Sequence, residues 1–254
     1  MYKLRLIKFF KQLHFSSIVR FFNLNQPPII ICGCPRSGTT ILQSMLSAHP
    51  KIQAISAESR IFRSYPFRIK FLNQIVHRLK VLNHLLRAPI KPKADRWLEK
   101  TPTNVLEIQN ILEEFDSKVK IIHIVRDGRD VITSFHPSKP NEYFVAPQQW
   151  VKLVKSGLKW KQHPSVLTLK YEDLILKKEN TMVLLLDFLA LDASPKMLNF
   201  PLYTTLKQPN SLMDKVSDLN AKSINKWKRL NHDKRIAMFN GIDEAVRLNS
   251  KLGY

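Results

Sequence analysis

A loop with the residue types of a phosphate-binding site follows an apolar run near the start of the chain. Residues 33–40 read GCPRSGTT, so four residues separate Gly33 from Gly38. The apolar residues before the loop predict a buried strand, and the residues after Gly38 predict a helix. In such a unit, backbone N–H groups and the positive end of the helix dipole converge on one phosphate. The spacing therefore predicts an anion-binding loop.

The loop lacks the lysine that ATP-binding loops carry. In those loops Gly-Lys-Ser/Thr ends the motif, with the lysine reaching the β- and γ-phosphates and the hydroxyl holding Mg²⁺. Here Thr39 stands at the lysine position, and Arg36 is the only cation of the loop. The run VKIIHIV is followed by Arg126 rather than by an aspartate that could hold magnesium. We therefore expect a nucleotide without a metal-bridged triphosphate, and no metal requirement.

Arg126 and Ser134 suggest a second anion site. They lie eight residues apart, at the end of the strand predicted over 119–125 and on the next helix, so both could reach one phosphate. The run RDGRD could equally be a charged turn. Two anion sites at neighbouring strand ends fit a nucleotide with phosphates at both its 5′ and its 3′ ends. That ligand is 3′-phosphoadenosine 5′-phosphosulfate (PAPS), the sulfuryl donor.

Three motifs, PRSGTT, LEKTP and IVRDGRDVITS, occur in this order. With them the chain resembles the sulfotransferase superfamily, specifically the branch similar to tyrosylprotein sulfotransferases and their bacterial relatives. The fragments LSAHP, AESR, KYEDL, KW and SKLGY agree with the resemblance, which spans residues 29–254. The resemblance implies an enzyme that moves a sulfuryl group from PAPS to an acceptor hydroxyl by in-line displacement.

The resemblance also implies which residues bind the donor. Those residues are Arg36, Ser37, Gly38, Thr39 and Thr40 for the 5′-phosphosulfate, Arg126 and Ser134 for the 3′-phosphate, Tyr171 for the adenosine, and Lys251 for closure over a phosphate. The sequence departs from the family at Asn225, where the family has a serine two residues before its tryptophan.

The resemblance implies Glu58 and Lys100 as catalytic residues, and we expect Arg36 to act with Lys100 by offsetting negative charge that grows on the bridging oxygen. Glu58 matches the general base, and Lys100 matches the lysine that acts on the phosphosulfate. Small-molecule sulfotransferases use a histidine two residues after this lysine, where the chain has Pro102, which cannot accept a proton. Compared with the animal enzymes of the family, the chain has one more residue between the His-Pro pair at 49–50 and Glu58. Glu58 could instead be a first-turn helix carboxylate or a partner of Arg60.

Strand and helix patterns alternate along the chain, which predicts a three-layer α/β/α domain around a parallel sheet. A basic amphipathic segment, 1–27, precedes this domain, which spans 28–254. We expect a loop over 137–147 and helices in most of the chain after residue 171. Strands are expected at 28–32, 51–55, 97–100, 119–125 and 166–171, and helices at 38–48, 67–88, 105–115, from the RDGRD loop to near Phe135, and at 150–160.

The chain of 254 residues has 41 Lys and Arg against 20 Asp and Glu, a net charge of +21. This charge predicts an anionic partner, and we expect a hydroxyl-bearing, anionic acceptor: a carbohydrate, a tyrosyl peptide or a lipid headgroup. The charge is spread along the chain without a zinc-finger or RNP-like pattern, so we expect no nucleic acid. A divergent P-loop kinase of a small molecule and a non-catalytic basic binding module are the alternative functions.

The N-terminal segment is both basic and apolar. Leu6, Phe9, Phe10 and Leu13 can share one helical stripe, and the chain has no apolar run of about 20 residues that could span a bilayer. Residues 1–22 could lie on a membrane surface or pack on the domain. We expect a cytoplasmic protein, and the sequence leaves open which of these two contacts the segment makes.

Cys32 and Cys34 lie one residue apart, a spacing that rarely allows an unstrained disulfide. We expect both to be small buried side chains, and His123, within the strand at 119–125, to be a buried structural histidine.

Overall fold

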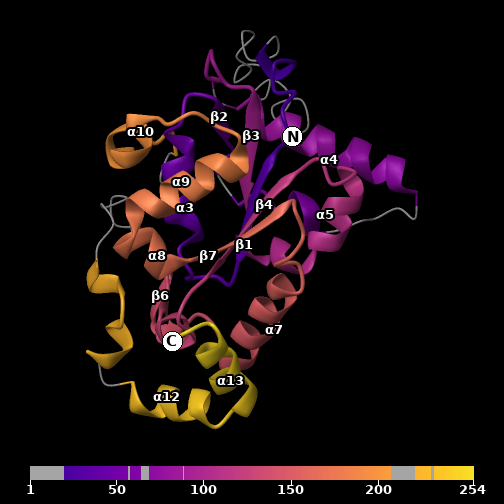
Figure 1. The fold of residues 1–254 in the computed structure, drawn as a ribbon. Helices are drawn as coiled ribbons and strands as arrows, with labels where there is room; N and C mark the ends of the chain where they lie inside the picture. The colour runs from indigo at the N-terminus through magenta and orange to yellow at the C-terminus, as the bar shows by residue number, and fades with distance from the viewer. Residues whose placement is uncertain (1–19, 57, 64–68, 88, 207–220, 230–231) are drawn as a thin grey trace.

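Five parallel strands form the centre of the protein in a computed structural model (Figure 1). The structure describes residues 20–56, 58–63, 69–87, 89–206, 221–229 and 232–254. The strand order is β2-β3-β1-β4-β7. Because every neighbouring pair is parallel, the carboxyl ends of the strands share one edge of the sheet. The five predicted strands are thus confirmed as β1 (Ile29–Gly33), β2 (Ile52–Ala54), β3 (Arg96–Lys100), β4 (Lys120–Val125) and β7 (Val166–Lys170).

Apolar side chains cover both faces of the sheet. Successive residues of a strand point to opposite faces, and in β1 the buried Ile29 and Ile31 join one core while Ile30 and Cys32 join the other. The first core is covered by α3 (Thr39–Ser47), α8 (Tyr171–Leu176), α9 (Lys178–Leu189), α10 (Pro195–Leu198) and α11 (Phe200–Tyr203). The second is covered by α4 (Lys70–Leu85), α5 (Ile108–Glu114), α6 (Gly128–Ile132), α7 (Pro147–Leu158), α12 (Asp233–Asn240) and α13 (Asp243–Lys251). The predicted three-layer α/β/α fold is confirmed.

The segment predicted as a loop over 137–147 is partly an antiparallel strand pair, β5 (Phe135–His136) and β6 (Lys139–Tyr143). β6 has the sequence KPNEY and is exposed throughout, so it lacks the apolar alternation that identifies a half-buried strand. The loop prediction was wrong here because the hairpin buries almost nothing.

Two predicted helices are shorter in the structure. The apolar stripe over 105–115 is divided between the 3₁₀ turn η2 (Pro102–Leu106) and α5. The helix after the RDGRD loop, α6, ends at Ile132. Just beyond that end, Thr133 Oγ1 donates to the carbonyl of Arg129, and Ser134 Oγ donates to that of Asp130. These side chains compete with the helical hydrogen bonds.

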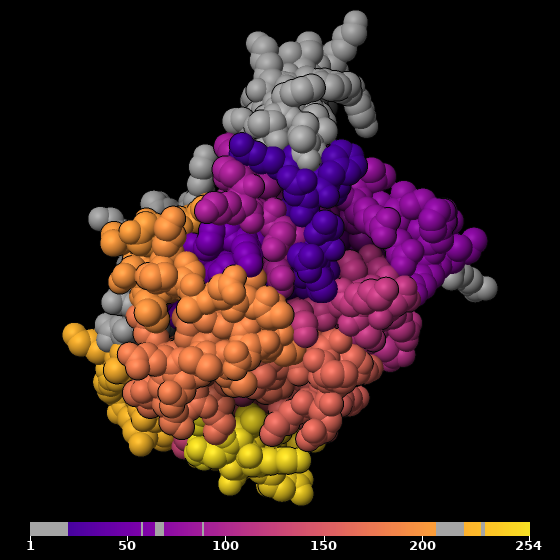
Figure 2. Space-filling model, turned by 45° about the horizontal axis from the view of Figure 1, so that its top comes forward, coloured from indigo at the N-terminus to yellow at the C-terminus, as the bar shows by residue number. Residues whose placement is uncertain are grey.

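The predicted basic amphipathic segment of residues 1–27 lies mostly outside the described residues. From Arg20 onward the chain packs on the domain, since Arg20 Nη1 donates to Ile90 O at 2.8 Å and Gln26 N donates to Asp95 O at 2.9 Å. The first described residues and the last residues of the chain lie at opposite ends of the molecule (Figure 2). No helix in the described ranges combines the length and the apolar character needed to cross a bilayer.

The two cysteines and His123 are buried structural residues, as predicted. Cys32 and Cys34 are free thiols, and burial raises the pKa of both. Burial lowers the pKa of His123 to about 4, and a Cβ on Gly157 of α7 would lie 2.3 Å from its ring. The imidazole therefore packs tightly against α7 as a neutral group.

Candidate functional site

The loop between β1 and α3 has the backbone of an anion cradle. Arg36 has a φ of 71° and Gly38 a φ of 93°, and both values lie in the left-handed region. A Cβ at Gly38 would lie 2.3 Å from Tyr171 Cδ2, so the tyrosine ring itself requires glycine there. Gly38 is the N-cap of α3, and no side chain caps that helix end. The first amides of α3 therefore face the loop.

The second predicted arginine lies against this loop. Arg126 follows β4, the strand next to β1, and its Nη1 donates to the carbonyl of Arg36 at 3.0 Å. Its guanidinium lies 4.3 Å from the ring centroid of Tyr171, and its Nη2 donates to Ser223 O. Tyr171 Oη is 2.7 Å from Ser223 Oγ. The structure thus brings Arg36, Arg126 and Tyr171 into one cluster.

A third cation, Lys226, joins the two arginines. It begins the 3₁₀ turn η4 (Lys226–Lys228), and its Nζ donates to Ser134 Oγ at 2.7 Å. Burial lowers the pKa of Lys226 to about 8, and repulsion from Arg126 and Arg36 contributes to the decrease. Three side-chain cations within mutual electrostatic reach would attract a multiply charged anion.

Asp130 connects η4 to Arg126. Its carboxylate is fully buried and accepts hydrogen bonds from Asn225 N at 3.0 Å and Trp227 N at 3.1 Å. It also lies 3.5 Å from Arg126 Nη2. Asn225, the departure from the family pattern, contributes its backbone to this anchor.

Several buried polar atoms of the cluster have no hydrogen-bond partner among the described residues. Buried polar groups are normally satisfied, so these atoms are available to a ligand that carries several acceptor oxygens. They are Arg36 Nε, Ser37 Oγ, Arg126 Nε and Trp227 Nε1. Every one of them is a donor. The residues present thus fit a nucleotide with two anionic ends.

Glu58 and Lys100 contact each other at the same edge of the sheet. Lys100 is the last residue of β3, which pairs with β1, and its Nζ donates to Glu58 Oε1 at 2.8 Å. The lysine side chain is buried, whereas 43% of the Glu58 side chain is exposed. Glu58 therefore pairs with Lys100 rather than with Arg60, and its carboxylate remains accessible to a substrate.

A buried carboxylate, Glu99, supports the segment that carries Glu58. Its Oε1 accepts from Ser59 Oγ at 2.6 Å and from Thr101 Oγ1 at 2.6 Å, and Thr101 Oγ1 accepts from Arg60 N at 3.2 Å. Its other oxygen accepts from Asn104 Nδ2 at 2.7 Å. Burial raises the pKa of Glu99, while these hydrogen bonds act in the opposite direction. The network fixes the backbone of residues 58–60 to the end of β3.

Lys251 is a predicted site residue whose side chain has no contact with the cluster among the described residues. It lies in the last turn of α13, its side chain is exposed, and no hydrogen bond or ion pair joins it to another described residue. α13 nevertheless contacts the RDGRD loop, because Gly128 N donates to Asn249 Oδ1 at 2.8 Å.

Thr39 is buried and Thr40 half-buried in the first turn of α3, beside the loop that follows β1.

Sequence reasoning missed Lys226, Asp130 and Glu99. The dipeptide KW drew attention to Lys226 only as part of the resemblance. Glu99 lies inside the LEKTP motif, next to Lys100, where a glutamate in a strand that is otherwise buried would have been the available signal.

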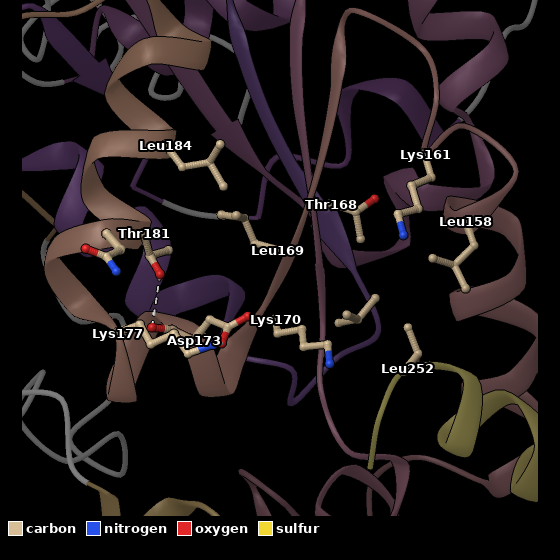
Figure 3. Close-up of a pocket in the computed structure, with 12 residues that line it drawn as sticks. Leu158, Lys161, Thr168, Leu169, Lys170, Asp173, Lys177, Thr181, Leu184 and Leu252 are labelled. Atoms are coloured by element: carbon tan, nitrogen blue, oxygen red, sulfur yellow. Dashed lines mark hydrogen bonds and ion pairs between the residues drawn. The ribbon is translucent and has the colours of Figure 1, made fainter.

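A separate cavity of about 300 Å³ lies at the outer edge of β7 (Figure 3). In Figure 3, Thr168 and Lys170 face the side of Lys161 and Leu252, while Leu169 faces α9. None of the predicted site residues lines it. Among the described residues, no group of three or more His, Cys, Asp or Glu side chains could hold a metal ion.

The sheet, the loop and the cations beside it define an α/β protein with a phosphate-binding loop at the carboxyl ends of its strands. Comparison with protein families matches residues 26–236 to the sulfotransferase domain. The chain therefore belongs to the sulfotransferase family.

Two animal proteins are similar in sequence. A protein-tyrosine sulfotransferase of Drosophila melanogaster is 24% identical over 241 residues, which cover 81% of this chain and 48% of the fly protein. Protein-tyrosine sulfotransferase A of Caenorhabditis elegans is 24% identical over 264 residues, which cover 92% of this chain and 68% of the worm protein. The chain thus spans about half the length of the fly relative.

Solved structures share the fold. The sulfotransferase domain of the Synechococcus PCC 7002 olefin synthase has a TM-score of 0.62 at 19% identity, covering 91% of this chain and 95% of that domain. A mouse sulfotransferase complexed with PAP has a TM-score of 0.56 at 15% identity, covering 96% of this chain and 95% of the mouse chain.

Proposed function

We propose that this protein transfers a sulfuryl group from PAPS to an acceptor hydroxyl. The observation that carries the proposal is the convergence of Arg36, Arg126 and Lys226 beside the phosphate loop, with the Glu58–Lys100 pair at the end of a neighbouring strand. Membership of the sulfotransferase family supports the proposal.

The donor nucleotide would be held by two sets of groups. The amides at the start of α3, with Arg36 and Ser37, suit the 5′-phosphosulfate. Arg126, Ser134 and Lys226 suit the 3′-phosphate, and Tyr171 lies between the two sets. When bound, the donor would supply an electrophilic sulfuryl group. The cations of this chain would then offset negative charge that develops during the displacement.

Glu58 is proposed as the general base. The exposed part of its carboxylate can accept the proton of the acceptor hydroxyl, and a positioned base contributes about 10²–10⁴-fold to such a step. Lys100, in contact with Glu58 Oε1, orients the carboxylate and adds positive charge beside the loop. Glu99 would keep Glu58 and Lys100 close together through its hydrogen bonds with Ser59 and Thr101.

The acceptor is proposed to be an anionic molecule with a free hydroxyl: a carbohydrate, a tyrosyl peptide or a lipid headgroup. The net charge of +21 supports an anionic acceptor. The similarity to protein-tyrosine sulfotransferases makes acidic tyrosyl peptides the first class to test. An acceptor screen read by mass spectrometry for the added SO₃ identifies the class.

Isothermal titration calorimetry with adenosine 3′,5′-bisphosphate (PAP), the desulfated donor, tests the donor site. Arg126→Ala removes a charged donor from a buried site, so PAP affinity should fall about tenfold or more. Arg247→Ala, an exposed arginine on α13, is the control and should leave affinity unchanged. Unchanged affinity in Arg126→Ala would refute the 3′-phosphate site, and tighter binding of ATP–Mg²⁺ than of PAP would favour a kinase.

We also propose that the protein is cytoplasmic and contacts a membrane peripherally through residues 1–22. The two free, buried cysteines are compatible with a reducing compartment. Cell fractionation of the full chain tests the location. Recovery in an oxidising compartment would contradict it.

A further inference from the structure

Helix α4 packs on the domain through a partly polar face. Its buried residues Asn73, His77, Val81 and Leu85 recur every four positions and form one stripe. His77 Nδ1 lies 2.7 Å from Glu114 Oε2 of α5. This buried pair and Gln74, whose Nε2 donates to Glu114 O at 2.7 Å, attach α4 to α5.

The opposite face of α4 is apolar and exposed. Phe71 is 65% exposed and Leu79 is 60% exposed. Residues three and four positions apart share a helix face, so the exposed side chains form one continuous strip. With Ile69 at the N-cap, the strip consists of Ile69, Phe71, Leu72, Ile75 and Leu79. Contiguous apolar strips of this kind mark interaction sites, unlike single exposed apolar residues.

Positive charges border this strip on both sides. Arg78 and Lys80 flank Leu79 in the sequence, so they project about 100° to either side of it on the helix. Arg87 follows the helix and is exposed. The helix contains no aspartate or glutamate. An apolar strip between two cationic borders is the arrangement of helices that lie in the surface of an anionic bilayer.

We propose that α4 docks on a membrane surface that contains anionic lipids, with the strip inserted at the level of the headgroups. Charge decides between this partner and others. A second copy of the chain also carries a net charge of +21, so the two copies would repel each other. The segment 1–22 carries five lysines and arginines and no acid, so it would repel the borders of the strip. In Figures 1 and 2, α4 lies at the outer rim of the molecule, where a flat surface can reach it.

Sedimentation of the full chain with lipid vesicles tests the proposal. We expect binding to vesicles of equal parts phosphatidylcholine and phosphatidylserine, little binding to phosphatidylcholine alone, and weaker binding at high salt. Leu79→Gln should weaken binding about tenfold, and Arg78→Gln about fivefold. Leu176→Gln is the matched apolar control, 65% exposed on α8, and Lys234→Gln is the charge control. Both controls should bind as the unchanged protein does.

A fluorescent label at position 79 separates the membrane from other occupants. Because Cys32 and Cys34 are buried, Leu79→Cys offers a selectively reactive thiol. We expect a polarity-sensitive label there to report water without vesicles and an apolar environment with phosphatidylserine vesicles. Leu176→Cys should show no change.

Three results would overturn the proposal. They are failure of the unchanged protein to bind phosphatidylserine vesicles, full binding by Leu79→Gln, and an apolar label environment without vesicles. The last result would mean that the chain itself, a second copy or a co-purified protein covers the strip. The proposal is independent of sulfuryl transfer. Circular dichroism spectra, which should be equal in all variants, verify that each one is folded.

Discussion

At the scale of single residues, the contact between Glu58 and Lys100 makes the proposed base directly testable. Glu58→Gln keeps the size and the hydrogen-bond acceptor but removes the charge and the basicity. Sulfuryl transfer should fall about 10²–10⁴-fold, while PAP affinity should stay nearly unchanged because the cation cluster is intact. A transfer assay together with calorimetry measures both quantities.

The control for this prediction is Glu142→Gln, which removes an exposed carboxylate paired with Lys139. It should leave transfer at the level of the unchanged protein. Transfer rates in Glu58→Gln equal to those of this control would move the base to another residue.

We expect donor binding to depend on pH through Lys226. Its pKa of about 8 means that the ammonium is charged below that pH and neutral above it. PAP affinity should therefore fall as pH rises through about 8, and binding near that pH should take up a proton, since a bound anion stabilises the charged form. Calorimetry in buffers of different ionisation enthalpy detects the proton.

Lys226→Gln should remove both effects, whereas Lys228→Gln, an exposed neighbour in η4, should retain them. A pH dependence that persists unchanged in Lys226→Gln would assign it to another group.

The sequence predicted part of this site for a geometric reason. Arg36 and Arg126 each follow a strand, and the carboxyl ends of neighbouring parallel strands meet at one edge. Lys226 comes about a hundred residues after Arg126, and its contact with Ser134 depends on how residues 221–229 fold back over α6. Local spacing contains no information about that return. The role of Glu99 is likewise visible only once residues 58–60 are placed beside β3.

At the scale of elements, Asp130 is the connection between α6 and η4. Asp130→Asn replaces one acceptor oxygen with a donor that faces a backbone N–H of Asn225 or Trp227. The free energy of unfolding should fall by about 1–3 kcal/mol, and PAP affinity should fall because Lys226 is no longer held in place. Denaturant unfolding and calorimetry measure the two effects.

Asp116→Asn is the matched control, since the exposed carboxylate of Asp116 pairs with Lys70 at the surface. Such pairs contribute little to stability. An Asp130→Asn protein as stable as this control would show that η4 is held by other contacts.

The predicted elements differ in how well their patterns identify them. All five strands of the sheet are largely buried, and the sequence located each of them. The β5–β6 hairpin was missed because its exposed residues carry no periodic pattern. α4 was predicted as a long helix, yet half of its eight apolar residues are exposed. Periodicity identifies a helix without stating which face meets the core.

At the scale of the whole molecule, donor binding should raise thermal stability. A ligand present at about 100 times its dissociation constant stabilises the folded state by about 2.7 kcal/mol. For a chain of this size that corresponds to a rise in Tm of about 5–10 °C. PAP should produce the rise in a thermal-shift assay, and ATP–Mg²⁺ should not. A comparable rise with ATP–Mg²⁺ would contradict the proposed choice of nucleotide.

The cation cluster draws on both layers of helices. Tyr171 belongs to α8, on the same side of the sheet as α3, whereas Arg126 leads into α6 on the other side. A nucleotide that binds all of these groups would connect the helix layers on the two faces of the sheet. A change that displaces either layer of helices would weaken nucleotide binding. Nucleotide affinity would therefore report whether both layers are correctly packed on the sheet.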